Sequence, residues 1–160
     1  MKTVVEQSVI HSTFVIERSY PTTPERVFAA LADPAKKRRW FAEGDNHEVE
    51  EFEMDFQVGG TERTRYRFKP GTPFPGISFM NDGNFQDIVA NRRVVVASTM
   101  TFGDRRISSS LTTFELLPTE KGTDLIFTHQ GAFYEGSDGP ERREEGWRKL
   151  IDKFGQELAH

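Results

Sequence analysis

Histidine is the side chain whose charge changes nearest neutral pH, so the four histidines of this sequence are the first candidates for chemistry. They stand at positions 11, 47, 129 and 160, and only His129 lies in a strongly patterned segment, TDLIFTHQGAF at residues 123–133. Alternation puts Leu125, Phe127 and His129 on one face of a strand and Asp124 on the other. His129 is then either a general acid or base, or a buried anchor hydrogen-bonded to a loop backbone. We favour the anchor, because no second residue at a readable spacing completes a catalytic set.

Residues 50–68, EEFEMDFQVGGTERTRYRF, predict a hairpin with one charged and one aromatic face. With a three-residue turn at residues 58–60, the acidic side chains of one strand oppose the arginines of the next. The expected pairs are Asp55–Arg63, Glu53–Arg65 and Glu51–Arg67. Opposed charges favour a solvated, mutually neutralising surface over a phosphate site. The other face, which we expect to point inward, carries Phe52, Met54, Phe56, Thr64, Tyr66 and Phe68.

The composition is that of a globular protein with an aromatic interior. The chain has 160 residues, of which 36% are hydrophobic and 29% charged, and it contains 14 phenylalanines. We expect a single domain at residues 1–160, with its core at about residues 13–158. Phenylalanine has no polar atom, so this number of rings favours a wide apolar interior with room for a ligand.

Charge and residue usage exclude several classes of protein. A net charge of −4 and a pI of about 5.6 argue against a nucleic-acid partner. The absence of cysteine excludes disulfides and thiolate chemistry. Scattered histidines predict no metal site, and without a glycine-rich phosphate motif we expect no cofactor. The N-terminal segment lacks the apolar core of a secretory signal, and no run is long and apolar enough to span a membrane. We therefore expect a cytoplasmic protein without membrane insertion.

The predicted elements are a strand, two short helices, a run of strands and a long helix. After a strand at residues 13–20, Thr23 caps a helix that ends near Asp33, because Pro34 follows. A short helix over PAKKRR comes next, and we place its basic side chains on the surface. Further strands are expected at residues 85–89, 94–102, 107–117 and 123–130. Their short connections predict an antiparallel meander.

Residues 69–84, KPGTPFPGISFMNDGN, are dense in proline and glycine and predict a loop. The loop contains Phe74, Phe79 and Met80, which a plain solvent loop does not need. These side chains either cover one mouth of an internal cavity or pack permanently at the edge of the core.

The last predicted element is a helix with Pro140 in its first turn and with Asp138 and Glu141 at capping-box spacing. One apolar stripe runs along it, formed by Trp147, Leu150, Ile151, Phe154 and Leu158. We expect this stripe to pack on the inner face of the meander. Gly146 interrupts the helix, which favours close approach of another group at that point.

Four local motifs occur along residues 14–158: TPERVFAALADPAKKRRWF, DFQVGG from Asp55, FTHQGAF from Phe127 and GWRKLIDKF from Gly146. With the order of elements, they resemble the SRPBCC (START/Bet v 1-like) superfamily, most closely the branch of the Hsp90-ATPase activator C-terminal domain. The resemblance implies an α+β helix-grip fold, in which a curved antiparallel sheet of about six to seven strands wraps around a long C-terminal helix, with two short helices after the first strand. It also implies an apolar cavity between sheet and helix.

Such a cavity leaves three functions open. The first is intracellular binding of a small hydrophobic molecule, as a carrier or sensor. The second is a cyclase or hydrolase with His129 as acid or base, and the third, implied by the resemblance, is a co-chaperone-like domain that stimulates a partner ATPase. The expected ligand-binding residues are Phe52, Met54, Phe56, Tyr66, Phe68, Phe127, His129, Trp147 and Ile151. Whether two chains pair as a homodimer stays open.

Overall fold

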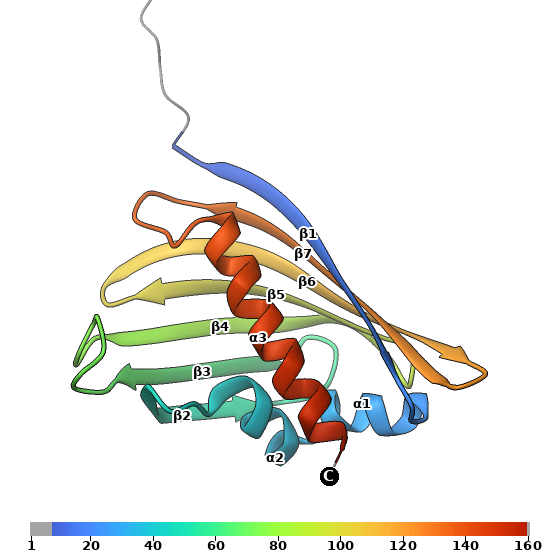
Figure 1. The fold of residues 1–160 in the computed structure, drawn as a ribbon. Helices are drawn as coiled ribbons and strands as arrows, with labels where there is room; N and C mark the ends of the chain where they lie inside the picture. Colours follow the sequence, from blue (N-terminus) through green and yellow to red (C-terminus); the bar gives the residue numbers. More distant parts are fainter. Residues whose placement is uncertain (1–7, 160) are drawn as a thin grey trace, which may run out of the picture.

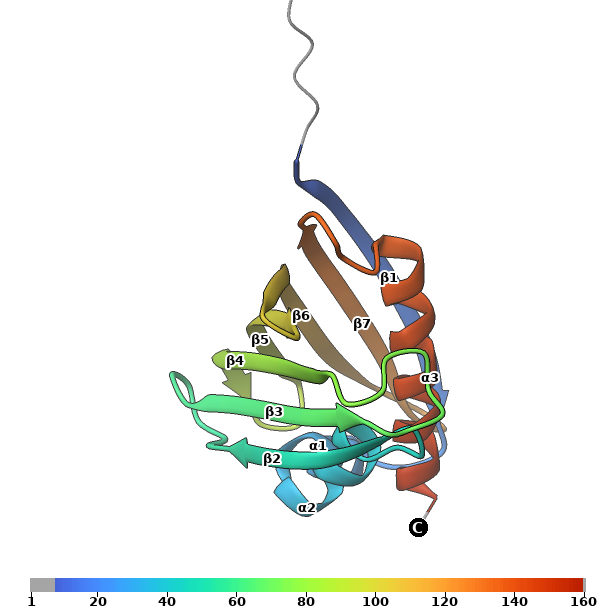
Figure 2. The same ribbon diagram turned by 90° about the vertical axis from the view of Figure 1, so that its left-hand side faces the viewer.

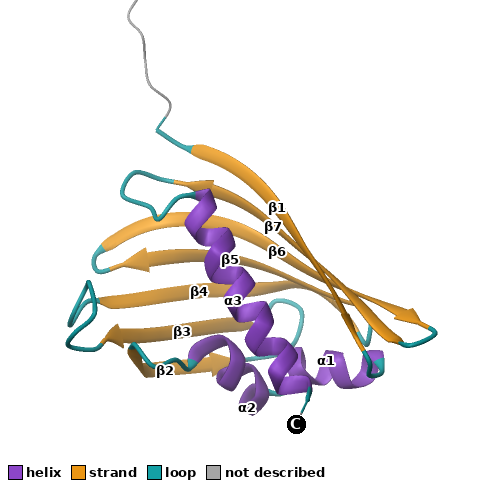
Figure 3. Ribbon diagram, viewed as in Figure 1, coloured by secondary structure: helices purple, strands orange, loops and turns teal. Residues whose placement is uncertain are grey.

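The computed structural model describes residues 8–159 as one curved antiparallel sheet with helices on its concave side (Figure 1, Figure 3). His160 and residues 1–7, which include part of the segment examined for a secretory signal, lie outside the described residues. The strands are β1 (Ile10–Tyr20), β2 (His47–Met54), β3 (Thr61–Phe68), β4 (Ser78–Val89), β5 (Arg93–Phe102), β6 (Arg105–Thr119) and β7 (Gly122–Phe133). Their order in the sheet is β1-β7-β6-β5-β4-β3-β2, a meander from β2 to β7 with β1 added beside β7. The predicted helix-grip fold is confirmed.

The helical elements are α1 (Pro24–Ala32), α2 (Pro34–Lys37), a π-helical turn η1 (Arg38–Ala42) and α3 (Pro140–Leu158). The Thr23 hydroxyl caps α1 by accepting a hydrogen bond from the Arg26 backbone N–H at 3.3 Å. Asp33 ends α1 and caps α2, where its carboxylate accepts from the Ala35 N–H at 2.9 Å. The Thr23 cap and the helix end at Asp33 are as predicted, whereas the second helix is shorter than predicted and ends at Lys37, after which η1 carries Trp40 into the core.

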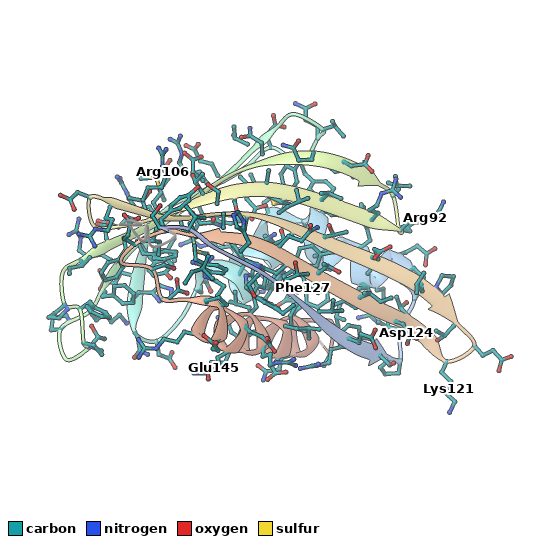
Figure 4. The ribbon with its side chains drawn as sticks, turned by 90° about the horizontal axis from the view of Figure 1, so that it is seen from above. Arg92, Arg106, Lys121, Asp124, Phe127 and Glu145 are labelled. Carbon is teal, nitrogen blue, oxygen red and sulfur yellow. The ribbon has the colours of Figure 1, made fainter. Side chains whose placement is uncertain are left out.

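The last helix, α3, crosses the concave face of the sheet (Figure 1, Figure 2). Its predicted stripe packs on one core: Trp147, Ile151 and Phe154 are buried, and Leu150 and Leu158 are partly buried. Figure 4 shows Phe127 between the strands and α3, while Glu145 projects from the outer side of the helix. Burying a side chain of this size stabilises the fold by about 1.5–3 kcal/mol, so the stripe is sufficient to hold α3 on the sheet.

The hairpin of β2 and β3 has the predicted faces but not the predicted register. The observed pairs are Glu53–Arg63, Glu51–Arg65 and Glu48–Arg67, so the predicted pairs Asp55–Arg63, Glu53–Arg65 and Glu51–Arg67 are wrong. The shift is two positions next to the turn, which keeps every side chain on its own face. The charged surface therefore still forms, and Arg63 lies 3.8 Å from Glu51 and 3.4 Å from Asp82.

The register differs because the turn is longer than three residues. β2 ends two residues before Phe56, whose ring leaves the strand to pack on Phe28 and Phe85, with centroids 5.6 and 5.1 Å apart. Gly60 closes the loop, since the Cβ of any other residue would lie 2.0 Å from the backbone oxygen of Asp55. Burial of one aromatic ring thus sets the register of the hairpin.

The predicted loop at residues 69–84 is too long, because β4 begins at Ser78 and includes Phe79 and Met80. Phe74 stays in the loop and is 47% exposed, with its ring centroid 5.0 Å from that of Phe102 and 6.2 Å from that of Phe68. Phe74 therefore packs on two half-buried rings outside the main hydrophobic core.

An ion pair holds the start of α3, and the predicted capping box does not form. Gly139 is the N-cap residue and makes no side-chain cap. Asp138 instead accepts hydrogen bonds from Nε and Nη2 of Arg143, each at 2.8 Å. Arg143 is buried, and its Nη2 also donates to the Ser108 hydroxyl on β6 at 2.9 Å. The pair therefore joins the first turns of α3 to the sheet.

This difference predicts how Asp138 responds to substitution. Asn caps a helix about as well as Asp, so Asp138→Asn would be neutral in a capping box. Loss of the charge beside a buried guanidinium should instead lower the free energy of unfolding by roughly 2 kcal/mol. Urea unfolding measures this, and Asp33→Asn is the matched control, because Asp33 does cap α2. Equal stability of Asp138→Asn and wild type would contradict the ion-pair interpretation.

Candidate functional site

A cavity of about 400 Å³ lies between the first half of α3 and the inner faces of β3, β4 and β5. This volume is typical of small-molecule sites. Tyr66 forms part of the wall and stacks with His47 and Phe79, with ring centroids 3.9 and 4.9 Å apart. Burial raises the pKa of Tyr66 to about 12, so its hydroxyl stays protonated. Trp147 and Leu150 form the helical side, and the cavity is mainly aromatic and aliphatic.

The charged part of the cavity wall comes mostly from α3, which contributes Arg142, Arg143, Lys149 and Lys153. Burial lowers the pKa of Lys153, whose ammonium donates to the backbone oxygen of Glu43. Burial by itself would raise the pKa of Asp138, but the hydrogen bonds from Arg143 lower it overall. Within residues 8–159, Nη1 of Arg143 has no hydrogen-bond partner.

Small and polar residues on the inner faces of the strands leave this space between the larger side chains of Tyr66, Phe79 and Met100. Glu62 on β3 pairs with Gly83 on β4, Gly83 with Ser98 on β5, and Ser98 with Ser110 on β6. The neighbouring row is Thr64, Asn81, Met100 and Ser108. Large apolar side chains at these positions would fill the space, since protein interiors pack to high density.

A smaller space of about 20 Å³ lies deeper against this row, and we call it the inner chamber. Its wall includes Lys37, Glu62, Asn81, Ser98, Ser110 and Thr112. Lys37 Nζ lies 3.1 Å from Glu62 Oε1, and both residues are 3% exposed. The ammonium also lies over the Phe41 and Trp40 rings, 4.6 and 5.0 Å from their centroids. A buried, cation–π-stabilised ion pair therefore forms one side of the chamber.

The surface position predicted for the basic cluster at residues 36–39 is wrong for Lys37. Lys37 precedes the buried Trp40 by three residues, so both side chains lie on the inward side of the same helical turns. Its partner was readable from the hairpin: strand alternation puts Glu62 on the inner face with Thr64 and Tyr66.

Three buried polar atoms near the inner chamber have no hydrogen-bond partner in the described part of the chain. They are Glu62 Oε2, Asn81 Oδ1 and Thr64 Oγ1. An unsatisfied buried group of this kind costs about 1–3 kcal/mol. A polar group that entered from the cavity would remove part of that cost.

His129 is buried, but it is not the hydrogen-bonded anchor that we predicted. It is 1% exposed, and neither ring nitrogen has a hydrogen-bond partner among the described residues. Its ring stacks on Phe14 at 4.7 Å and lies 6.1 Å from Phe133 and 6.5 Å from Trp147, between centroids. Burial, together with the charge of Arg143, lowers the pKa of His129 to about 4. The imidazole is therefore neutral at pH 7 and acts as an aromatic core residue, which gives an acid–base role no support.

Two of the predicted ligand-binding residues, Tyr66 and Trp147, line the cavity. The other seven are not part of its wall: Phe52, Met54, Phe56, Phe68, Phe127, His129 and Ile151. Phe127 and Ile151 are core residues, and the Phe127 ring supports Trp147 at a centroid distance of 4.5 Å. Ligand contact by any of the nine stays a prediction. Sequence patterns did not indicate His47, Asn81 or Arg143, whose positions depend on the tertiary fold.

Gly146 lines the cavity, and the predicted close approach of another group there is wrong. Apart from its chain neighbours and the backbone of its own helix, no atom lies within 4 Å of the place where a side chain would begin, and Gly146 is exposed. Glycine costs a helix interior about 1 kcal/mol relative to alanine, and here it leaves the cavity open. Within residues 8–159, no cluster of three or more His, Cys, Asp or Glu side chains is arranged to hold a metal ion. None of the helices described there is long and apolar enough to cross a membrane.

The burial of His129 predicts a specific pH dependence. Below its ordinary pKa of 6.5, His129 takes up a proton in the unfolded chain but not in the folded protein, whose pKa is about 4. Its contribution to stability is therefore complete above pH 6.5 and falls as the pH falls toward 4. Between pH 7.5 and pH 5, the loss should be about 2 kcal/mol. Urea unfolding of wild type and His129→Leu at both pH values measures it, with His11→Gln, an exposed histidine, as control. An unchanged pH dependence in His129→Leu would contradict the assignment.

Comparison with known proteins gives matches over most of the chain. The family model AHSA1, Activator of Hsp90 ATPase homolog 1-like protein, matches residues 21–159. The Mll3558 protein from Rhizobium loti is 48% identical over 94% of this chain and 99% of its own, with a TM-score of 0.83. A protein from Rhizobium leguminosarum is 34% identical over 95% of this chain and 97% of its own, with a TM-score of 0.87.

More distant structures share the fold. The AHSA1-like protein from Aeromonas hydrophila is 22% identical, with 92% of each chain covered and a TM-score of 0.68. Comparison with curated proteins gives no match. The match of the family model and the two closer structures confirm the resemblance in the sequence motifs, and the chain belongs to the Activator of Hsp90 ATPase homolog 1-like family of the SRPBCC superfamily.

Proposed function

We propose that this protein is an intracellular carrier or sensor that binds a small, mostly apolar molecule in the cavity between α3 and β3–β5. The observation that carries the proposal is the cavity of about 400 Å³ with its aromatic wall. Burial of apolar ligand surface supplies the driving force, at about 25 cal/mol per Å² before the costs of ordering. Tyr66, Phe79 and Trp147 offer rigid ring surfaces, which lose little conformational freedom when a ligand binds.

Position 146 provides a direct test. A Phe side chain at Gly146 would begin in open space and extend into the cavity, so Gly146→Phe should fold and should fill the site. We expect wild type to bind one molecule of a fluorescent hydrophobic probe, and Gly146→Phe to bind it about tenfold more weakly or not at all. Fluorescence titration measures both affinities.

The matched control is Glu145→Phe, which adds the same ring to the outer side of α3 (Figure 4). It should bind the probe as wild type does, and thermal unfolding should show that all three proteins are folded. Equal affinity of Gly146→Phe and wild type would locate the probe elsewhere and would contradict the proposal.

The family description favours a second candidate, because it names activation of the Hsp90 ATPase. A domain with that role would act through its surface and would not need an open cavity. The protein would then raise the ATPase rate of a purified Hsp90-type chaperone, and Gly146→Phe would raise it equally. A rate that the protein does not change would count against this candidate.

A further inference from the structure

The polar groups of the inner chamber restrict the chemical class of the ligand more than the mainly apolar cavity does. The cavity and the chamber share four wall residues, Phe41, Asn81, Met100 and Trp147, so these side chains form the boundary between the two spaces. Met100 is unbranched and flexible, and Asn81 Oδ1 is buried without a hydrogen-bond partner among the described residues. One small group of a molecule bound in the cavity can therefore reach the chamber by displacing the Met100 side chain.

The chamber offers an unused acceptor and an available donor. Glu62 Oε1 faces Lys37, whereas Oε2 is buried and without a hydrogen-bond partner among the described residues. Lys37 has three N–H donors, and besides Glu62 its ammonium faces the rings of Trp40, Phe41 and Phe114. An oxygen that enters the chamber is a stronger partner for an N–H than a ring face. The best guest thus donates one hydrogen bond and accepts another.

The charge of the chamber selects against ionised groups. Lys37 and Glu62 neutralise each other at 3.1 Å, so an ammonium or carboxylate guest would add an uncompensated charge to a buried site. The space is about 20 Å³, which accepts one hydroxyl or one water molecule. A hydroxyl group combines the right size, neutral charge, one donor and an acceptor oxygen.

We infer that the ligand is a neutral apolar alcohol or phenol, whose hydroxyl enters the inner chamber, donates to Glu62 Oε2 and accepts from Lys37. This inference rests on the proposed ligand binding in the cavity and adds the chemical class and the orientation of the ligand. The polar end lies inside and the apolar body fills the aromatic cavity.

The test compares four compounds that share one ring system: 2-naphthol, naphthalene, 2-methoxynaphthalene and 2-naphthoate. Each competes with the fluorescent hydrophobic probe for the wild-type protein. We expect 2-naphthol to bind at least about tenfold more tightly than naphthalene, because a hydrogen bond to a charged group is among the stronger ones. O-methylation removes the donor, so 2-methoxynaphthalene should lose this advantage without any change in the protein.

The variant Lys37→Met with Glu62→Leu removes both charges together, a replacement that buried ion pairs often tolerate. The double variant should bind 2-naphthol and naphthalene with equal affinity. Its affinity for naphthalene should equal that of the wild type. Equal affinities of the wild type for 2-naphthol, naphthalene and 2-methoxynaphthalene would mean that the chamber holds only water, and would overturn the inference while leaving the cavity proposal in place. Tightest binding of 2-naphthoate, or a 2-naphthol advantage that the double variant keeps, would also overturn it. Failure of the probe and of all four compounds to bind would overturn both.

Discussion

One helix has to cover the concave face of a seven-stranded sheet, and the rest of the structure depends on this constraint. α3 has 19 residues, so it is about 28 Å long and about 10 Å wide. Seven strands spaced about 4.8 Å apart make a sheet about 29 Å across. Because α3 crosses the strands (Figure 1), its length spans most of this width, but it covers a band only about 10 Å wide along the strands, and curvature of the sheet, α1, α2 and η1 must cover or fill the remainder. Where they do not, the space stays hollow.

The space between α3 and the sheet is filled under the second half of the helix and hollow under the first half. Under its second half, large rings fill the interior: Phe154 lies 5.1 Å from Trp40, and Trp40 lies 6.3 Å from Phe114, between centroids. Under its first half, the opposing strands carry serine, threonine, asparagine and glycine, and α3 itself carries Gly146. The same fold is thus packed at one end and open at the other, and smaller side chains on the strands contribute to the difference.

The two ion pairs beside the cavity, Lys37–Glu62 and Arg143–Asp138, have different roles. Replacement of a buried ion pair by apolar residues often leaves stability unchanged or improved, so stability does not explain why Lys37 and Glu62 are inside. The pair and the unpaired polar atoms beside it instead make the inner chamber polar, so that it can form hydrogen bonds with a polar group of a ligand. Arg143 and Asp138 differ from it and have a structural role: two hydrogen bonds join Arg143 to Asp138, and a third joins Arg143 to Ser108 on β6.

Local patterns predicted the elements well, and tertiary contacts account for the errors. Thr23, Asp33 and the stripe from Trp147 to Leu158 behave as capping and periodicity require. The hairpin register could not be read, because it depends on where the Phe56 ring finds its partners. The capping spacing of Asp138 was misleading, since a buried arginine five residues later binds the same carboxylate. In the site, alternation alone could have identified Glu62 as an inward carboxylate, but the contact with Lys37 exists only in three dimensions.

The pairing of β1 with β7 has a consequence for how the chain folds during synthesis. β1 is made before the other six strands, yet its neighbour in the sheet is made last among them, and the Ser19 hydroxyl donates to Asp124, 105 positions later, at 2.7 Å. The inner faces of the strands also remain uncovered until α3 follows. Contacts that span most of the chain form slowly, and exposed apolar strands aggregate readily in the meantime. The native state therefore requires α3 to have emerged from the exit tunnel, and until then the apolar inner faces of the strands stay exposed.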